Sequence, residues 1–297
     1  MTKELANVEV RLARIEDKDP VLSFCKNTWE NQPDYIHLVW DKWFADPRGC
    51  IFVAVVDGLP IAMERVVLMS DCEAWWEGLR VDSRYRGQGL VGILRPHLER
   101  YLQEAGILIS RNCVSSENTI MNGIMTRRGR QKVGCYASYK ADPIHSSVTK
   151  LVQLRSDDFD LAWTLVSSSN FFGQERCLYI SRGAKWQELT TQQLSDRLEA
   201  GLVWGLKQSN LLVAIAIQSS LEGSNQTLWI GFVNGTATSL PTLLYELRLL
   251  AEYQDYLAVG GIFPLCKNIV EYLNRAGYQR YYNEDYWVYE WQIDYQQ

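Results

Sequence analysis

The sequence lacks any apolar run near the roughly 18 residues that a membrane-spanning helix needs. Its first residues, MTKELANVEVRLARIEDKD, are charged throughout and lack the apolar core of a signal peptide. The seven cysteines are scattered, odd in number and never arranged as CxxC, so they predict neither a disulfide framework nor a zinc site. A reduced, cytoplasmic protein without a metal or a membrane partner is the simplest interpretation.

The sequence also lacks a surplus of basic residues. Its 297 residues include 30 basic and 35 acidic ones, which gives a net charge of -5. Nucleic-acid binding needs a concentrated basic face, and the one short basic stretch, residues 127–132, is more typical of a helix end and a turn. We therefore expect no nucleic-acid partner. The remaining composition, 47% hydrophobic and 22% charged, is ordinary for globular domains.

An alternating strand and helix pattern fills the first half of the chain and recurs in the second. In the first half, hydrophobic periodicity predicts strands at 8–14, 73–81, 106–114 and 132–140, a hairpin within 50–69 and helices at 20–30, 36–45, 90–104 and 116–129. In the second half it predicts strands at 148–154, 202–207, 211–218, 226–233, 256–263 and 281–291 and helices at 157–168, 239–253 and 266–278.

The recurrence, at an offset of about 150 residues, indicates an internal duplication. Each copy is an α/β (α+β) unit with a mixed central sheet flanked by helices. The join lies in YKADPIHSSVTK, where proline and serine interrupt the pattern. We therefore predict two domains, residues 1–143 (the first half) and 148–297 (the second half).

The stretch VDSRYRGQGLVGIL, residues 81–94, has the features of a strand end, a glycine turn and a helix start. Such a turn leaves backbone N–H groups free at the helix N-terminus, where they and the helix dipole attract an anion. The candidate donors are Gln88, Gly89, Leu90, Val91 and Gly92, with Arg86 adding charge. No Gly-Lys-Ser/Thr follows, which excludes a Walker A loop, and the glycine spacing does not match GxGxxG.

The run RGQGLV, residues 86–91, resembles the R/Q-x-x-G-x-G/A signature of the GNAT (GCN5-related N-acetyltransferase) superfamily. Its position after a fourth strand ending LRVDSRYRG is similar to that family's usual arrangement, and the resemblance covers about Val8 to Tyr139. Val91 stands where the family usually has glycine or alanine. The stretches DYIHLVWDKWFADPRG, DGLPIAMERV and EGLRVDSRYRGQGLVG are similar to the two-domain subgroup that includes histidine N-acetyltransferases.

The resemblance implies tandem GNAT-like folds and acetyl-CoA as the co-substrate. The family's coenzyme phosphates lie on the glycine turn, and its pantetheine arm lies along the fourth strand. This implies coenzyme-binding roles for Leu79, Arg80, Val81, Arg86, Gly87, Gln88, Gly89, Leu90, Val91, Gly92 and Asn118.

Glu77 is the expected general base. It holds the position of the carboxylate that relays a proton in related polyamine acetyltransferases, and it shares a strand face with Glu73 and Trp75 unless a bulge intervenes. The alternative is an ordinary polar residue near a strand end. The tyrosine that often protonates the leaving thiolate in this family is replaced by Met125, so the sequence identifies no general acid.

The acceptor is expected to contact Asp34, Tyr35, Trp40 and Trp75, because acids and aromatics together suit a small cationic or zwitterionic amine. Two alternatives stay open: Trp40 as part of the hydrophobic stripe of an amphipathic helix, and Asp34 as a helix cap. An α-amino acceptor with a pKa near 8 is already about a tenth neutral at pH 7, unlike a lysine-type amine. An amino acid such as histidine is therefore one candidate.

The second half lacks the anion-binding features of the first. Its corresponding turn is Thr236-Ala237-Thr238-Ser239-Leu240-Pro241, without glycine or arginine, and Pro241 removes an N–H group. We expect a degenerate copy that binds no coenzyme. The leading prediction is an N-acetyltransferase for a small amine, monomeric or homodimeric. A protein or peptide acetyltransferase and a non-catalytic acyl-CoA-binding regulatory module are the alternatives.

Overall fold

The computed structural model describes residues 7–26, 28–29, 33–145, 148–169, 177–220 and 226–294. The chain divides into two compact units: unit 1 comprises residues 1–112 and 290–297, and unit 2 comprises residues 113–289. Strands β5 (Ile109–Ser115) and β14 (Gln279–Gln292) contribute residues to both units. These units are defined by compactness. The predicted boundaries at 143 and 148 instead separate the two copies of a repeated sequence pattern, and they stay a prediction.

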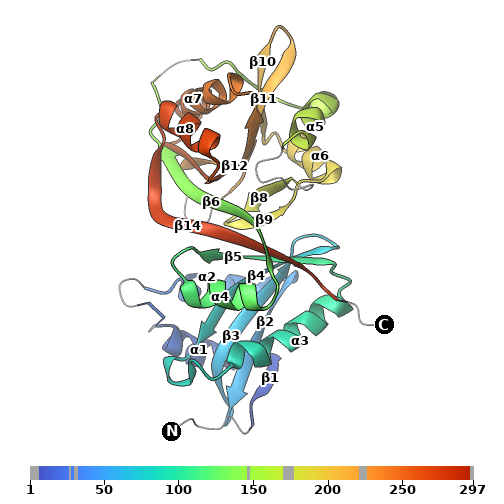
Figure 1. The fold of residues 1–297 in the computed structure, drawn as a ribbon, viewed down its shortest axis with the longest axis vertical. Coiled ribbons are helices and arrows are strands. Elements are labelled where there is room, and N and C mark those ends of the chain that lie inside the picture. Colours follow the sequence, from blue (N-terminus) through green and yellow to red (C-terminus); the bar gives the residue numbers. More distant parts are fainter. Residues whose placement is uncertain are drawn as a thin grey trace. The chain divides into compact units, whose positions relative to one another are not determined.

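Unit 1 contains a mixed sheet whose first four strands form an antiparallel series. The strands are β1 (Glu9–Leu12), β2 (Gly49–Val56), β3 (Leu59–Leu68) and β4 (Glu73–Val81), followed by β5 and the end of β14. The predicted hairpin turn joins β2 to β3, and Asp57 and Gly58 both have positive φ there. β4 and β5 run parallel and are connected through helix α3 (Leu90–Glu104) (Figure 1).

Helices cover both faces of the unit 1 sheet. Helices α1 (Lys18–Cys25) and α2 (Ile36–Ala45) pack Val21, Ile36 and Trp40 against β2 and β3. On the other face, α3 packs a stripe of leucines at positions 90, 94, 98 and 102 against the sheet, which confirms the predicted periodicity. Helix α1 ends before the predicted residue 30, and Asn27 and Glu30 lie outside the described residues.

Unit 2 contains a second mixed sheet, in the order β14-β6-β13-β12-β11-β10-β7. Its strands are β6 (Gln131–Ala141), β7 (Leu151–Gln153), β10 (Val203–Gln208), β11 (Leu211–Gln218), β12 (Thr227–Gly235) and β13 (Ala258–Pro264), together with β14. β12 and β13 run parallel, as β4 and β5 do. Helices α7 (Ser239–Tyr253) and α8 (Lys267–Arg275) cover one face and α5 (Phe159–Ser167) and α6 (Thr191–Glu199) the other.

Helix α4 (Thr119–Arg127) of unit 2 was predicted, but a further helix, a small hairpin and the pairing of strands from the two halves were not. Helix α6 and a small hairpin of β8 (Leu178–Arg182) and β9 (Lys185–Glu188) follow α5. β14 lies between β5 and β6 in the strand order, and β6, the last strand of the first half, pairs with β13 of the second. Helix α4 packs Met125 against Val114 of β5 and Tyr289 of β14. Each half therefore places its last strand beside a strand of the other.

Candidate functional site

The glycine turn between β4 and α3 keeps its backbone open. Asp82 accepts from the Arg84 backbone N–H at 3.0 Å and starts a short turn. Gly87 and Gly89 then have φ values of 75° and 80°, a conformation that side chains rarely adopt. No atom lies within 4 Å of the position that a Cβ would take at either glycine. The backbone conformation, and not a lack of space, therefore requires glycine here.

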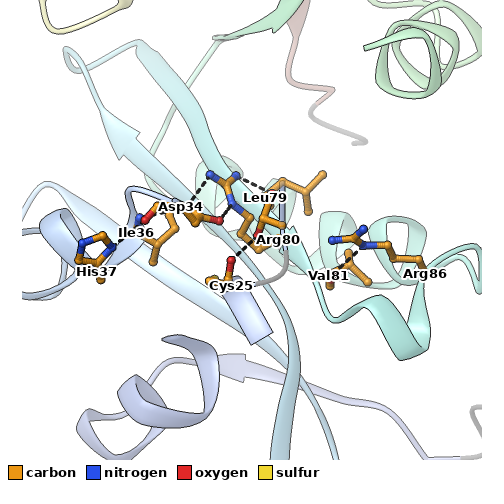
Figure 2. Close-up of polar contacts among 9 residues, drawn as sticks. Cys25, Asp34, Ile36, His37, Leu79, Arg80, Val81 and Arg86 are labelled. Carbon is orange, nitrogen blue, oxygen red and sulfur yellow. Dashed lines mark hydrogen bonds and ion pairs between the residues drawn. The ribbon is translucent and has the colours of Figure 1, made fainter. Parts of the chain in front are cut away.

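Helix α3 begins directly after this turn without a side-chain cap. Gly89 is the N-cap residue, and because glycine has no side chain, it makes no cap bond to the first N–H groups of the helix. Arg86 is exposed, and its Nε donates to the Val81 carbonyl at 3.2 Å (Figure 2). An uncapped helix N-terminus with an adjacent guanidinium has the donors and the charge to bind a phosphate group.

β4 contains a bulge just before this turn. Arg65 of β3 lies opposite Glu77, whereas Met63 lies opposite Arg80, so Gly78 and Leu79 together face one residue of β3. Gly78 has a φ of 71°, and a Cβ there would lie 2.6 Å from the Trp43 ring. The bulge follows Glu77 and therefore leaves Glu73, Trp75 and Glu77 on one face, as predicted from strand alternation.

β4 separates from β5 before the bulge. The parallel pairing covers only Glu73 with Ile109, Ala74 with Ser110 and Trp75 with Arg111. Beyond Trp75, the described residues of β4 have no β5 partner. Residues 76–81 therefore offer backbone groups along an edge of the strand, where an extended chain can add by hydrogen bonding.

Glu77 lies in a buried ion-pair cluster on the α2 side of the sheet. Arg65 donates to Glu77 through Nη1 and to Asp46 through Nη2, the latter at 2.6 Å. The Arg65 side chain is 2% exposed, whereas those of Glu77 and Asp46 are 11% and 23% exposed. The carboxylates thus lie nearer to solvent than the guanidinium that binds both of them.

Asp34 and Arg80 form a second ion pair on this face (Figure 2). Arg80 donates from Nε to Asp34 at 2.6 Å and from Nη2 at 3.1 Å, and its Nη1 donates to the Leu79 carbonyl. Burial by itself would raise the pKa of Asp34, but the bonds from Arg80, Thr28 and the Ile36 backbone outweigh it and lower that pKa.

Aromatic rings lie next to this pair. The Arg80 guanidinium is 4.7 Å from the Trp29 ring and 5.1 Å from the Tyr35 ring. Tyr35 in turn contacts Trp43, whose ring is 5.0 Å from the Arg65 guanidinium. Trp29 and Tyr35 are 38% and 39% exposed. A row of rings thus connects the Asp34 pair with the cluster that holds Glu77.

The predicted acceptor residues fall into two groups. Asp34 and Tyr35 lie beside Arg80, on the face that carries Glu77. Trp40 is fully buried in the core between α2 and the sheet, which matches the hydrophobic-stripe alternative, and Trp75 is 2% exposed. Asp34 also accepts from the Ile36 backbone N–H at the start of α2, although the N-cap residue of that helix is Tyr35 and not Asp34.

Asn118 is the last of the predicted coenzyme contacts along the chain, and it belongs to unit 2. Its Oδ1 accepts from the Met121 backbone and caps α4. On the same helix, Asn122 accepts from the Tyr289 hydroxyl at 3.0 Å. Met125 is fully buried beside Tyr289. Burial raises the pKa of Tyr289, so this hydroxyl stays protonated at neutral pH.

The corresponding turn of the second half is closed by its own side chains. Ser239 Oγ donates to the Val213 carbonyl at 2.6 Å and accepts from the Thr236 backbone at 2.9 Å. Thr236 Oγ1 accepts from the Ser239 backbone at 3.1 Å. The Ser239 N–H, which corresponds to the Gly89 donor of the first half, is therefore already satisfied.

Sequence reasoning missed the arginine partners of this site. Arg65 lies in LPIAMERVVL, where a Glu-Arg pair interrupts an otherwise apolar strand, and this interruption was the available signal. Arg111 of β5 is likewise buried and donates to Glu73 and, at 2.7 Å, to Glu290 of β14. Charged residues within buried strands require partners, but the sequence does not say which ones.

Neither metal binding nor membrane insertion has a candidate in the part of the chain that the structure describes. No group of three or more His, Cys, Asp or Glu side chains there could hold a metal ion. None of the described helices is both long enough and apolar enough to cross a membrane.

Comparisons with known proteins agree on one family. Residues 12–129 match the Acetyltransferase (GNAT) family. A histidine N-acetyltransferase from Oreochromis niloticus is 30% identical over 90 residues, which are 30% of this chain and 26% of that protein. The match therefore spans about a quarter of the relative's length.

Two solved structures match nearly the whole chain. A GCN5-related N-acetyltransferase from Sphaerobacter thermophilus superimposes with a TM-score of 0.63 at 15% identity and covers 96% of each chain. A tandem GNAT protein from the clavulanic acid biosynthesis pathway gives 0.56 at 12% identity, over 98% of this chain and 100% of that one. These likenesses confirm the predicted tandem, mixed α/β fold.

Proposed function

We propose that this chain, whose residues 12–129 match the Acetyltransferase (GNAT) family, transfers the acetyl group of acetyl-CoA to the amine of a small molecule. The observation that carries the proposal is the arrangement of β4. Its residues 76–81 are not paired with β5, and the glycine turn that follows leads into the uncapped helix α3. Glu77 lies in the same strand, on the side of the sheet that α2 covers. A strand edge, a glycine turn before an uncapped helix and a carboxylate thus occur within the consecutive residues 76–92.

The coenzyme would be held by two parts of this arrangement. Its phosphates would accept from the backbone of residues 87–92 and from Arg86, because these donors lie at an open helix N-terminus. Its pantetheine arm would bond to the β4 backbone at Leu79, Arg80 and Val81. The contact expected from Asn118, a residue of unit 2, stays a prediction.

Acetyl-CoA would supply an activated acyl group, and Glu77 would take the proton from the attacking amine. Arg65 orients the Glu77 carboxylate by donating a hydrogen bond to it. Arg65 is itself positioned by its ion pair with Asp46 and by its contact with the Trp43 ring. A base positioned in this way contributes about 10²- to 10⁴-fold in rate.

The acceptor would be a small cationic or zwitterionic amine. In the Arg65 cluster the more exposed charged side chains are the carboxylates of Glu77 and Asp46, while Arg65 lies deeper. The exposed rings of Trp29 and Tyr35 add a surface that attracts cations. Histidine is one candidate because a distant relative bears its name, and its α-amino group is partly neutral at pH 7.

Thiol release from acetyl-CoA tests the proposal. The purified chain would be assayed against free amino acids, polyamines and a basic peptide. We expect turnover with one class of small amine and a fall in kcat of about 100-fold or more in Glu77→Gln. Glu104→Gln, an exposed residue at the end of α3, is the matched control and should keep full activity.

The same assay separates the alternatives. A peptide acetyltransferase would prefer the basic peptide to every free amine. A regulatory module would bind acetyl-CoA without thiol release, and Glu77→Gln would leave its affinity unchanged. Arg86→Ala should weaken acetyl-CoA binding in all three cases, with Arg100→Ala on exposed α3 surface as the control. A cytoplasmic location and a monomeric or homodimeric state stay predictions.

A further inference from the structure

Arg95 is a charged residue in the hydrophobic core of unit 1. It lies on α3, is fully buried, and has its guanidinium 5.2 Å from the Trp76 ring. Its Nη2 donates to Glu64 Oε1 at 3.3 Å, a length beyond the usual range for a bond between charged groups. The buried residues of this core cluster are mainly leucine, alanine, isoleucine and tryptophan.

Two nitrogens of this guanidinium lack acceptors. Nε and Nη1 of Arg95 are buried and have no hydrogen-bond partner among the described residues. Native proteins rarely leave buried donors unsatisfied, and each exception calls for a water, an ion or a functional reason. A guanidinium has five N–H donors and no acceptor, so these two nitrogens can be satisfied only by an acceptor.

The location of Arg95 connects it to the open part of β4. Glu64 lies on β3 opposite the bulge at Gly78 and Leu79. Trp76 is the first β4 residue beyond the last pair with β5. The guanidinium contacts both of these residues and so lies on the α3 side of the β4 stretch that lacks a β5 neighbour.

We propose that Arg95 binds a carbonyl oxygen of the pantetheine–acyl arm of acyl-CoA. The inference rests on the proposed function, which places that arm along this stretch of β4. The arm carries amide and thioester carbonyl groups, and each can accept from a guanidinium N–H. Because Glu64 already balances the charge of Arg95, a neutral carbonyl suits the site better than a second anion.

Binding measurements with two ligands test this role. One is acetyl-CoA, and the other is 3′-phosphoadenosine 5′-diphosphate, which is the coenzyme without its arm. Arg95→Lys keeps a positive charge for Glu64 but loses the planar fork. It should weaken acetyl-CoA binding at least about tenfold and leave the affinity for the armless ligand within about twofold. Arg100→Lys, on the exposed face of α3, is the control and should change neither affinity.

The double variant Arg95→Met with Glu64→Met guards against misfolding, because it removes both charges and leaves neither buried alone. It should show the same selective loss. Equal losses for both ligands, no loss for either, or failure of both variants to fold would make Arg95 a core residue only and overturn the inference. If the wild-type chain binds neither ligand, the coenzyme site itself is wrong, and this result is distinct from the others.

Discussion

The loop after β4 and the loop after β12 join the same kinds of element in the two halves, yet they satisfy their backbones in opposite ways. In the first half, Gly87 and Gly89 turn the chain without contributing side chains, and α3 begins uncapped. In the second half, the Thr236 and Ser239 hydroxyls bond to each other's backbone. One loop leaves donors for a ligand, and the other uses them for its own stability.

A related difference separates the charged residues nearby. The first half buries Arg65 and Arg80 and gives each a carboxylate, and the pKa of one of these carboxyl groups, Asp34, is lowered. The loop of the second half is stabilised by neutral hydroxyls, which do not titrate. A pH-dependent loss of stability is therefore expected from variants in the first half, and a pH-independent loss from variants in the loop of the second half.

The largest expected effect concerns Asp34→Asn. Removing one partner of a buried ion pair leaves Arg80 unbalanced and should lower the free energy of unfolding by about 3 kcal/mol at pH 7. The pKa of Asp34 is lowered in the folded chain, so its contribution is present above the unfolded value of about 3.9 and is lost as pH falls through the folded value. Urea unfolding from pH 7 to pH 3 should therefore show the two proteins converging only at acidic pH.

Asp41→Asn is the control for this experiment. Its carboxylate is 74% exposed and bonds to Lys18 on the surface, and such pairs contribute about 1 kcal/mol at most. If Asp34→Asn destabilises the chain no more than Asp41→Asn does, the buried Asp34–Arg80 pair contributes no more to stability than a surface pair.

The next effect tests the two loops directly by giving the first the sequence of the second. The variant carries Arg86→Thr, Gly87→Ala, Gln88→Thr, Gly89→Ser and Val91→Pro, with Leu90 already shared. Acetyl-CoA binding should weaken more than about 100-fold, because the charge is gone and proline removes a donor N–H. Calorimetry should find one coenzyme per wild-type chain. Undiminished affinity in a folded variant would mean that the coenzyme binds elsewhere.

The sequence predicted most elements of the fold because hydrophobic periodicity is local. The leucine stripe of α3 and the Asp57-Gly58 hairpin are both read within a few residues. The pairing of β6 with β13 was not predicted, because strand neighbours far apart in sequence leave no local signal. The Arg65–Glu77 pair was not predicted for a similar reason, because the register that places the two residues opposite each other depends on the pairing of β3 with β4 and on the bulge.

Ser239→Ala gives a smaller effect in the second half. Its buried hydroxyl bonds to Val213 and Thr236, so its loss should lower the free energy of unfolding by about 1–2 kcal/mol. The loss should be the same at pH 7 and pH 4, since no group in the bond titrates, and acetyl-CoA affinity should not change. Urea unfolding and a binding titration provide both readings. A changed affinity would contradict a coenzyme site confined to the first half.

The smallest effect, Gly89→Ala, separates strain from binding. Alanine at a φ of 80° should lower the free energy of unfolding by about 1 kcal/mol, and no atom crowds the added Cβ. Gly58→Ala is matched, because Gly58 has a φ of 79° and equally open surroundings in the β2–β3 turn. Both variants should lose similar stability, but only Gly89→Ala should also weaken acetyl-CoA binding, by about tenfold, because its methyl group would keep a phosphate from the backbone. Equal affinities in the two variants would show that the open donors of the first loop serve another purpose.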